Sequence, residues 1–169
     1  MATIITSRAR LTALGEKALA AFPGLRIAKD QPYRLFDLAL DFAEESPDLG
    51  LALAARVKDF CEAEGTHAKV SSIHVNAWFG DYDKLSCAEL FLSRVLGIDP
   101  IKNPRALIFF GDSPNDEPMF QRFPLTCGVA NVSRYEAFLK FPPAFITKRP
   151  FGYGFAEGCS VLLNLLEAR

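Results

Sequence analysis

Two carboxylates, Asp112 and Asp116, have the type and spacing best suited to chemistry. They follow the apolar run 107–110, which has the length of a strand, and they precede an apolar segment that predicts a helix. Open α/β sheets bind ligands at the carboxyl ends of their strands. Mg²⁺ typically takes one or two carboxylates and leaves its other positions to water and phosphate. The spacing therefore indicates a magnesium site, although the same residue types also favour turns.

The whole segment 107–120 is more specific than the two carboxylates alone. It runs from an apolar strand through Gly-Asp-Ser-Pro-Asn-Asp to a methionine, and it resembles the fourth motif of the haloacid dehalogenase (HAD) superfamily of phosphatases. Segment 74–86 brings Lys84 to the start of an expected helix and resembles the third motif. The spacing from Lys84 to Asp112 is similar to that of the large-cap branch, which holds the Cof-like, sucrose-phosphate and mannosyl-3-phosphoglycerate phosphatases.

This resemblance implies a Mg²⁺-dependent phosphatase that acts on a sugar phosphate or a similar small phosphorylated metabolite. Asp112 would bind Mg²⁺, and Asp116 would complete or orient the metal shell. Lys84 would supply a fixed positive charge beside the phosphate. Ser113 and Asn115 would hydrogen-bond the lysine, water or phosphate. Without the resemblance, Lys84 would be interpreted as an ordinary exposed lysine.

Residues of the N-terminal part would select the substrate. His74, Asn76 and Trp78 alternate along one expected strand, so they would share a face that can bind hydroxyl groups and stack on a sugar ring. Arg34 is a fourth candidate. The alternatives are that this face is the solvated side of an antiparallel sheet, and that Arg34 only pairs with Asp37.

The nucleophile motif of the resembled family, an apolar strand ending in Asp-x-Asp-Gly-Thr, is absent from the 169 residues. Residues 81–83 read Asp-Tyr-Asp but continue into the lysine helix, so we interpret them as a helix start. The β-prone segment 2–7 could hold the second motif, with Thr6 or Ser7 binding a phosphoryl oxygen, or it could be a frayed terminus or an edge strand.

We therefore expect a fragment that is inactive by itself, and the alternative is a non-catalytic remnant that binds a partner. Its sheet would have an apolar edge at residues 106–110. This edge predicts self-association, pairing with a missing N-terminal half, or recruitment of residues 2–6 as a substitute strand. No Gly-rich phosphate loop occurs, which disfavours a nucleotide-binding or receiver-like protein.

Hydrophobic periodicity predicts helices and strands that divide near Gly80. Residues 1–79 are expected to form a cap-like α+β segment. Residues 80–169 are expected to form the C-terminal half of a HAD-like, Rossmann-like α/β core, because strands alternating with helices indicate parallel β-α units. The expected helices are 11–22, 49–63, 85–96, 117–123, 133–139 and 157–168, and the expected strands are 35–42, 69–78, 106–110, 126–129 and 144–147.

Composition limits the partners. Half of the chain is hydrophobic and its formal net charge is −1, with no basic run, which argues against nucleic acid and anionic membranes. No apolar run reaches the roughly 18 residues of a membrane span, and no signal peptide is visible, so a cytoplasmic location is expected. Four widely spaced cysteines without Cys-x-x-Cys argue against zinc and for reduced, mostly buried thiols.

Overall fold

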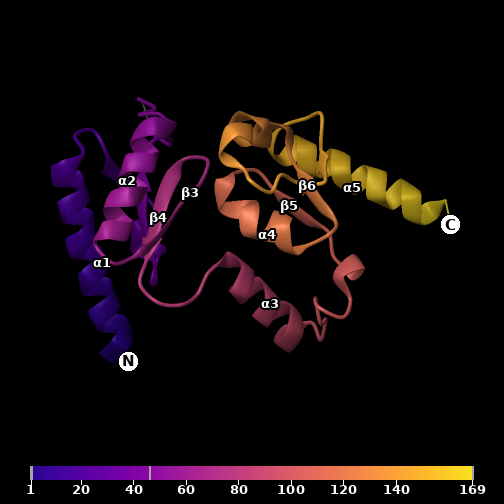
Figure 1. The fold of residues 1–169 in the computed structure, drawn as a ribbon, viewed down its shortest axis with the longest axis horizontal. Coiled ribbons are helices and arrows are strands. Elements are labelled where there is room, and N and C mark those ends of the chain that lie inside the picture. The colour runs from indigo at the N-terminus through magenta and orange to yellow at the C-terminus, as the bar shows by residue number, and fades with distance from the viewer. Residues whose placement is uncertain (1, 46, 169) are drawn as a thin grey trace. The chain divides into compact units, whose positions relative to one another are not determined.

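The computed structural model describes residues 2–45 and 47–168 (Figure 1). The chain forms two compact units, Met1–Asp81 and Tyr82–Arg169. Together they give the mixed α/β fold that the sequence predicts. None of the described helices is long and apolar enough to cross a membrane.

The N-terminal unit is a four-stranded antiparallel sheet with two helices packed on one face. The strand order is β1-β2-β4-β3, with β1 at Arg26–Ile27, β2 at Leu38–Asp41, β3 at His67–Val70 and β4 at His74–Trp78. The helices are α1, Ala2–Ala21, and α2, Leu51–Ala63.

The core of this unit lies between the helices and the sheet. The register pairs Leu38 with Ala77 and Leu40 with Val75, so these side chains point to the same face. They meet the buried stripes of both helices, formed by Leu11, Leu14, Ala18, Ala54, Val57 and Cys61. The amphipathic helices predicted from periodicity are confirmed. The same periodicity places Leu19 on the apolar stripe of α1, but its side chain is exposed.

The segment 2–7 is helical and forms the first turns of α1. The expectation of a strand there, ending in Thr6 or Ser7 as a second motif, is therefore wrong. A helix that is already nucleated and packed gains one hydrogen bond for each residue added, and here this gain outweighs the β-propensity of the β-branched residues.

The single strand expected over 69–78 is a hairpin of β3 and β4. The chain reverses at Ser71, whose N–H donates to the His74 carbonyl (2.7 Å) and whose hydroxyl accepts the His74 N–H (2.9 Å). Serine offers the backbone such local hydrogen bonds in turns. The apolar-polar alternation continues on both sides of this turn, which explains why it indicated one strand.

The C-terminal unit contains a parallel sheet of order β5-β6-β7, as expected from the alternation of strands and helices. The strands are Phe109–Gly111, Thr126–Gly128 and Phe145–Ile146. Three α-helices accompany them, α3 at Lys84–Val95, α4 at Glu117–Arg122 and α5 at Phe151–Glu167. Short 3₁₀ segments occupy Pro104–Ala106, Pro114–Asp116 and Ala130–Phe138, the last in place of the α-helix expected at 133–139.

Helix α5 begins at Phe151, six residues before the expected start at 157. Glycine is unfavourable in a helix interior, but Gly154 is needed here for packing. A Cβ at Gly154 would lie 2.2 Å from the Arg149 carbonyl oxygen, so the close approach of this helix to the preceding segment requires glycine.

The four cysteines are free thiols. Cys61 and Cys127 are buried and Cys87 is exposed. The expectation of unpaired thiols is confirmed, and the expected burial holds fully for two of them.

Candidate active site

Gly111 ends β5 and makes room for the loop that follows. A Cβ at this position would lie 2.7 Å from Cζ of Phe120 and 2.8 Å from Cβ and Cγ of Asp116. These separations are too short for real contacts, so only glycine allows Asp116 to pack under the end of the strand. The Gly-Asp pair of the sequence therefore has a steric reason.

Asp116 is 2% exposed, and its two carboxylate oxygens have different partners. Oδ2 accepts the backbone N–H groups of Asp112 (2.8 Å) and Ser113 (3.3 Å) and so closes the loop after β5. Oδ1 accepts a hydrogen bond from the Lys84 ammonium. Buried charges are tolerated when they are paired and hydrogen-bonded in this way.

Lys84 is the first residue of α3, and a capping box fixes the start of that helix. The Asp83 carboxylate accepts the Ser86 N–H (2.7 Å), while the Ser86 hydroxyl accepts the Asp83 N–H (3.0 Å). The Lys84 side chain is about half exposed, and its Nζ lies 5.8 Å from the centre of the Phe109 ring. The structure thus brings together two residues that the sequence places 32 positions apart.

Asp112 follows β5 and is half-buried. Its Oδ2 accepts a hydrogen bond from Nδ2 of Asn131 (3.1 Å), and no hydrogen bond to its Oδ1 occurs among the described residues. The buried Ser113 hydroxyl donates to Oδ1 of Asn115 (2.9 Å), so these two candidates bind each other within the loop. Sequence reasoning missed Asn131, because nothing in its local sequence indicates its partner.

The donor set suits one hard divalent cation held by few protein ligands. Asp112 offers a carboxylate oxygen, whereas both oxygens of Asp116 are already engaged. Across residues 2–45 and 47–168 no group of three or more His, Cys, Asp or Glu side chains could enclose a metal. Mg²⁺ is commonly bound through one or two carboxylates and keeps several waters, so the residues fit this ion.

A cavity of about 310 Å³ adjoins Lys84 within the C-terminal unit. The other residues that line this cavity are apolar. They belong to α3, to β5 and the two residues before it, and to α4 and the residue after it. They are Ala88, Phe91, Leu92, Leu107, Ile108, Phe109, Met119 and Phe123. Lys84 is thus the charged residue that lines an otherwise apolar cavity.

The N-terminal candidates His74, Asn76 and Trp78 share one face of β4. His74 is buried and its Nε2 lies 2.8 Å from a Glu44 carboxylate oxygen. Oδ1 of Asn76 is buried without a hydrogen-bond partner, and the Trp78 ring lies 5.8 Å from the ring of His67. Their role in substrate selection stays a prediction.

Arg34 is engaged by two carboxylates. It forms two hydrogen bonds to Asp30 (2.9 and 2.8 Å) and one to Asp37 (2.7 Å). The hydrogen bond from Arg34 lowers the pKa of Asp30, and the Asp30 carboxylate raises the pKa of Arg34. This geometry is the pairing that the sequence left open as the alternative to a substrate contact.

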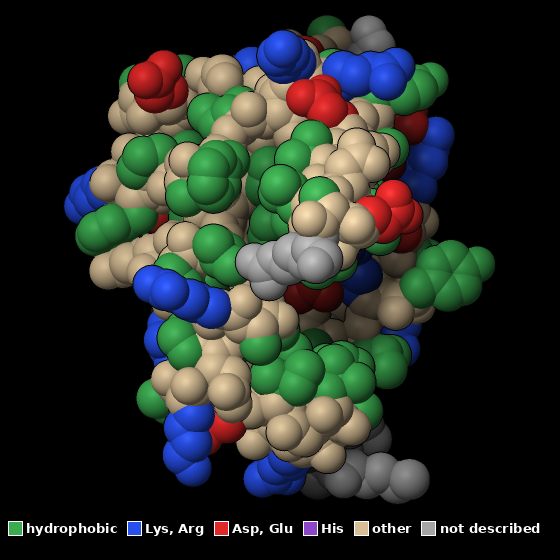
Figure 2. Space-filling model, turned by 90° about the vertical axis from the view of Figure 1, so that its right-hand side faces the viewer, with side chains coloured by type: hydrophobic (Ala, Val, Ile, Leu, Met, Phe, Trp, Pro, Cys, Tyr) green, Lys and Arg blue, Asp and Glu red, His purple; other side chains and the backbone are tan. Residues whose placement is uncertain are grey.

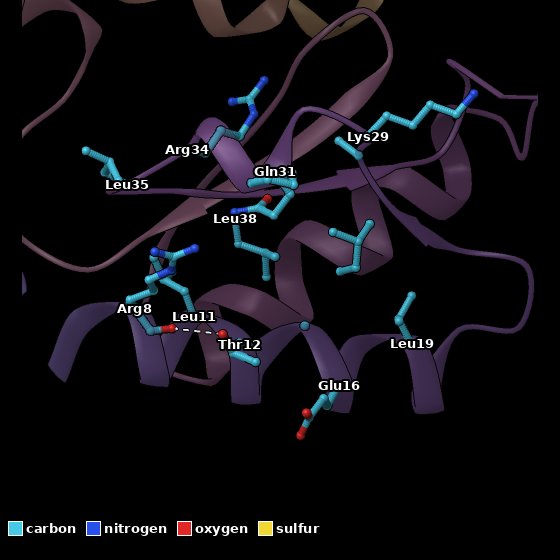
Figure 3. A pocket seen from close by; sticks show the side chains of 14 residues that line it. Arg8, Leu11, Thr12, Glu16, Leu19, Lys29, Gln31, Arg34, Leu35 and Leu38 are labelled. Carbon is cyan, nitrogen blue, oxygen red and sulfur yellow. Dashed lines mark hydrogen bonds between the residues drawn. The ribbon is translucent and has the colours of Figure 1, made fainter. Parts of the chain in front are cut away.

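Arg34 also lines a hollow of about 510 Å³ between α1 and the segment 27–38 (Figure 3). Its floor includes Leu11 and Leu38, and Lys29 stands at its edge. Lys29 pairs with Glu45 (2.5 Å), and this hydrogen bond raises the pKa of Lys29. Two of the cations near this hollow are therefore already neutralised by acidic neighbours.

The fold is similar to solved structures. A crystal structure of Thermoplasma acidophilum 0175 matches with a TM-score of 0.57 and 17% identity over 87% of this chain and 58% of that chain. A trehalose-6-phosphate phosphatase related protein matches with a TM-score of 0.50 and 15% identity over 93% of this chain and 63% of that chain. The chain thus spans about three fifths of the length of both structures.

A weaker likeness, with a TM-score of 0.41 and 16% identity, is to yhjK, a haloacid dehalogenase-like hydrolase protein from Bacillus subtilis. Neither a protein-family model nor a curated protein matches the sequence. The chain therefore has a mixed α/β fold similar to that of a phosphatase-related protein. A cluster of one lysine and two carboxylates lies at the end of one of its parallel strands.

Proposed function

We propose that this chain is part of a Mg²⁺-dependent phosphatase of the HAD superfamily that acts on a sugar phosphate or a similar small phosphorylated metabolite. The observation that carries the proposal is the cluster of Lys84, Asp116 and Asp112 at the carboxyl end of β5. Two motifs in the sequence and the fold of a trehalose-6-phosphate phosphatase related protein support it.

Each residue has a role that follows from its contacts. Asp112 would hold the cation through its carboxylate, because Asp116 is occupied by the loop backbone and the lysine. When bound, Mg²⁺ would neutralise charge that develops on the phosphoryl group. Asp116 orients Lys84, whose ammonium offers hydrogen bonds and positive charge to a phosphate oxygen.

The reaction also needs an attacking carboxylate. The 169 residues contain no Asp-x-Asp-Gly-Thr segment, so we assign the nucleophile to a segment outside them. Asp81 and Asp83 are poor candidates, because the Asp83 carboxylate caps α3 and Asp81 is fully exposed. We expect no turnover of p-nitrophenyl phosphate by this chain alone.

Calorimetric titration with Mg²⁺ tests the cation site. Wild type should bind Mg²⁺ weakly, and Asp112→Asn should abolish binding because an amide is a much poorer ligand for this ion than a carboxylate. Glu136→Gln, which removes an exposed carboxylate of the same unit, is the matched control and should bind as wild type does. Equal binding by wild type and Asp112→Asn would rule out Asp112 as a ligand.

A second candidate function is a non-catalytic, partner-binding module. The exposed apolar side chains of α5 favour it, since Phe151, Tyr153, Leu163 and Leu166 are each more than half exposed. In that case Asp112→Asn would leave partner binding unchanged, and α5 substitutions would weaken it.

A further inference from the structure

Asn131 joins three segments of the C-terminal unit through its side-chain amide. It lies just after β6, at the start of the 3₁₀ segment, and is 9% exposed. Its Nδ2 donates to Oδ2 of Asp112 (3.1 Å), and its Oδ1 accepts the backbone N–H of Phe151 (3.0 Å). One side chain therefore contacts both the candidate cation ligand and the first residue of α5.

The backbone on either side of Asn131 is fixed to the same two segments. The Val129 N–H donates to the Gly111 carbonyl (3.0 Å), immediately before Asp112. The Ala130 N–H donates to the Arg149 carbonyl (3.2 Å), two residues before Phe151. The amide of Asn131 is thus held at a set position relative to Asp112.

The hydrogen bond between Asn131 and Phe151 also stabilises an unusual backbone conformation. The φ of +53° at Phe151 is disfavoured for a residue with a Cβ, and such a conformation persists only where the surroundings hold it. The hydrogen bond from its N–H to Asn131 is one of the contacts that hold it. The amide therefore has a structural task at α5 and a separate contact at Asp112.

We propose that Asn131 is a positioning residue for Asp112: it holds one carboxylate oxygen so that the other is presented to the cation. The inference rests on the proposed function, which makes Asp112 the cation ligand. Removing an outer partner of a metal ligand typically lowers metal affinity by about 10–100-fold, because the ligand then loses its fixed orientation. We expect a loss in this range for Asn131→Ala.

Two variants separate the positioning task from the structural one. Asn131→Ala removes both contacts of the amide. In the double variant Asn131→Ala/Phe151→Gly, residue 151 becomes glycine, which adopts positive φ without steric strain. The start of α5 should then no longer depend on Asn131, whereas Asp112 still lacks its hydrogen bond. Phe151→Gly alone and the exposed Ser133→Ala serve as controls.

The readouts are the Mg²⁺ affinity by calorimetry and the broadening of the Asp112 and Ser113 amide signals by Mn²⁺ in NMR spectra. Both Asn131 variants should bind Mg²⁺ about 10–100-fold more weakly than wild type, with reduced Mn²⁺ broadening, while both controls bind as wild type does. Wild-type affinity in Asn131→Ala would overturn the inference. So would recovery of affinity in the double variant, because Asn131 would then act only through α5.

The wild type and Asp112→Asn decide the proposed function in the same experiment. If wild type binds no Mg²⁺, or Asp112→Asn binds equally, the cation site fails and the inference falls with it. If wild-type binding depends on Asp112 but not on Asn131, the inference alone fails.

Discussion

At the scale of single residues, Gly111 and Asp116 show why the candidate site has its composition. The carboxylate of Asp116 lies under the strand end, where it binds two backbone N–H groups and the Lys84 ammonium. Space for it exists only because position 111 has no side chain. The site therefore requires glycine at position 111 as strictly as it requires the charged residues.

Gly111→Ala tests this requirement. The added methyl group would overlap Phe120 and Asp116, so we expect a loss of about 1–3 kcal/mol in the free energy of unfolding, the usual effect of overpacking. Urea unfolding measures this difference. Gly152→Ala is the matched control, because a Cβ there meets no atom within 4 Å and the helix gains an alanine. A Gly111→Ala protein as stable as wild type would show that Asp116 need not lie under the strand.

At the scale of elements, short hydrogen-bonded features determine where helices and strands begin and end. The capping box of Asp83 and Ser86 starts α3 directly at Lys84, which places the ammonium at the helix terminus. Ser71 divides one expected strand into β3 and β4. Helix boundaries depend on such local partners, whereas the interior of each helix depends on its buried stripe.

Cys61, a buried residue of α2, should make the free energy of unfolding depend on pH. Burial raises the pKa of this thiol to about 11 from its ordinary value of 9.0. Between these pH values the unfolded chain has lost the proton and the folded chain keeps it, so the free energy of unfolding falls as pH rises. The fall from this group is at most about 1.4 kcal/mol per pH unit.

The measurement compares wild type with Cys61→Ala in urea at pH 8 and pH 11. Other groups titrate in this range in both proteins, so the difference between them isolates Cys61. We expect the advantage of wild type over Cys61→Ala to shrink by about 2–3 kcal/mol between the two pH values. An advantage that stays constant would mean that the thiol ionises in the folded protein as it does in the unfolded chain.

At the scale of the whole molecule, apolar surface is concentrated in the C-terminal unit. Groups of exposed hydrophobic side chains are visible on the face shown in Figure 2. Helix α5 is apolar on several sides, which is typical of a helix that is covered by other elements. Strand β5 is an edge of the described sheet, and edge strands pair readily with other chains.

We therefore expect the purified 169-residue chain to self-associate at micromolar concentration. Sedimentation velocity gives the mass of the species in solution. The double variant Leu163→Lys/Leu166→Lys should shift the distribution toward monomer, because both side chains are more than half exposed on α5. A wild-type monomer whose Phe110 amide hydrogen exchanges rapidly with solvent would contradict the prediction. The edge of the sheet at β5 would then be unpaired in a stable monomer.

Features that depend on neighbours along the chain could be predicted from the amino-acid sequence. Gly-Asp after an apolar run predicted the end of β5, and the lysine after Asp83 predicted the start of α3. The buried stripes of α1 and α2 were also visible, because a period of 3.6 residues places the same positions on one face of any helix. These two boundaries and the buried stripes were therefore predicted, whereas the starts of α1 and α5 and the turn at Ser71 were not.

Contacts between residues far apart in the sequence could not be predicted in this way. Asn131 reaches Asp112 across 19 positions and Phe151 across 20, and both contacts form because β6 pairs with β5 while the chain before α5 returns to β6. The helical state of residues 2–7 was hidden for a related reason. Local β-propensity favoured a strand, and continuity with a packed helix overrode it. Contacts between distant segments have no fixed spacing in the sequence, so they become visible only when the chain is folded.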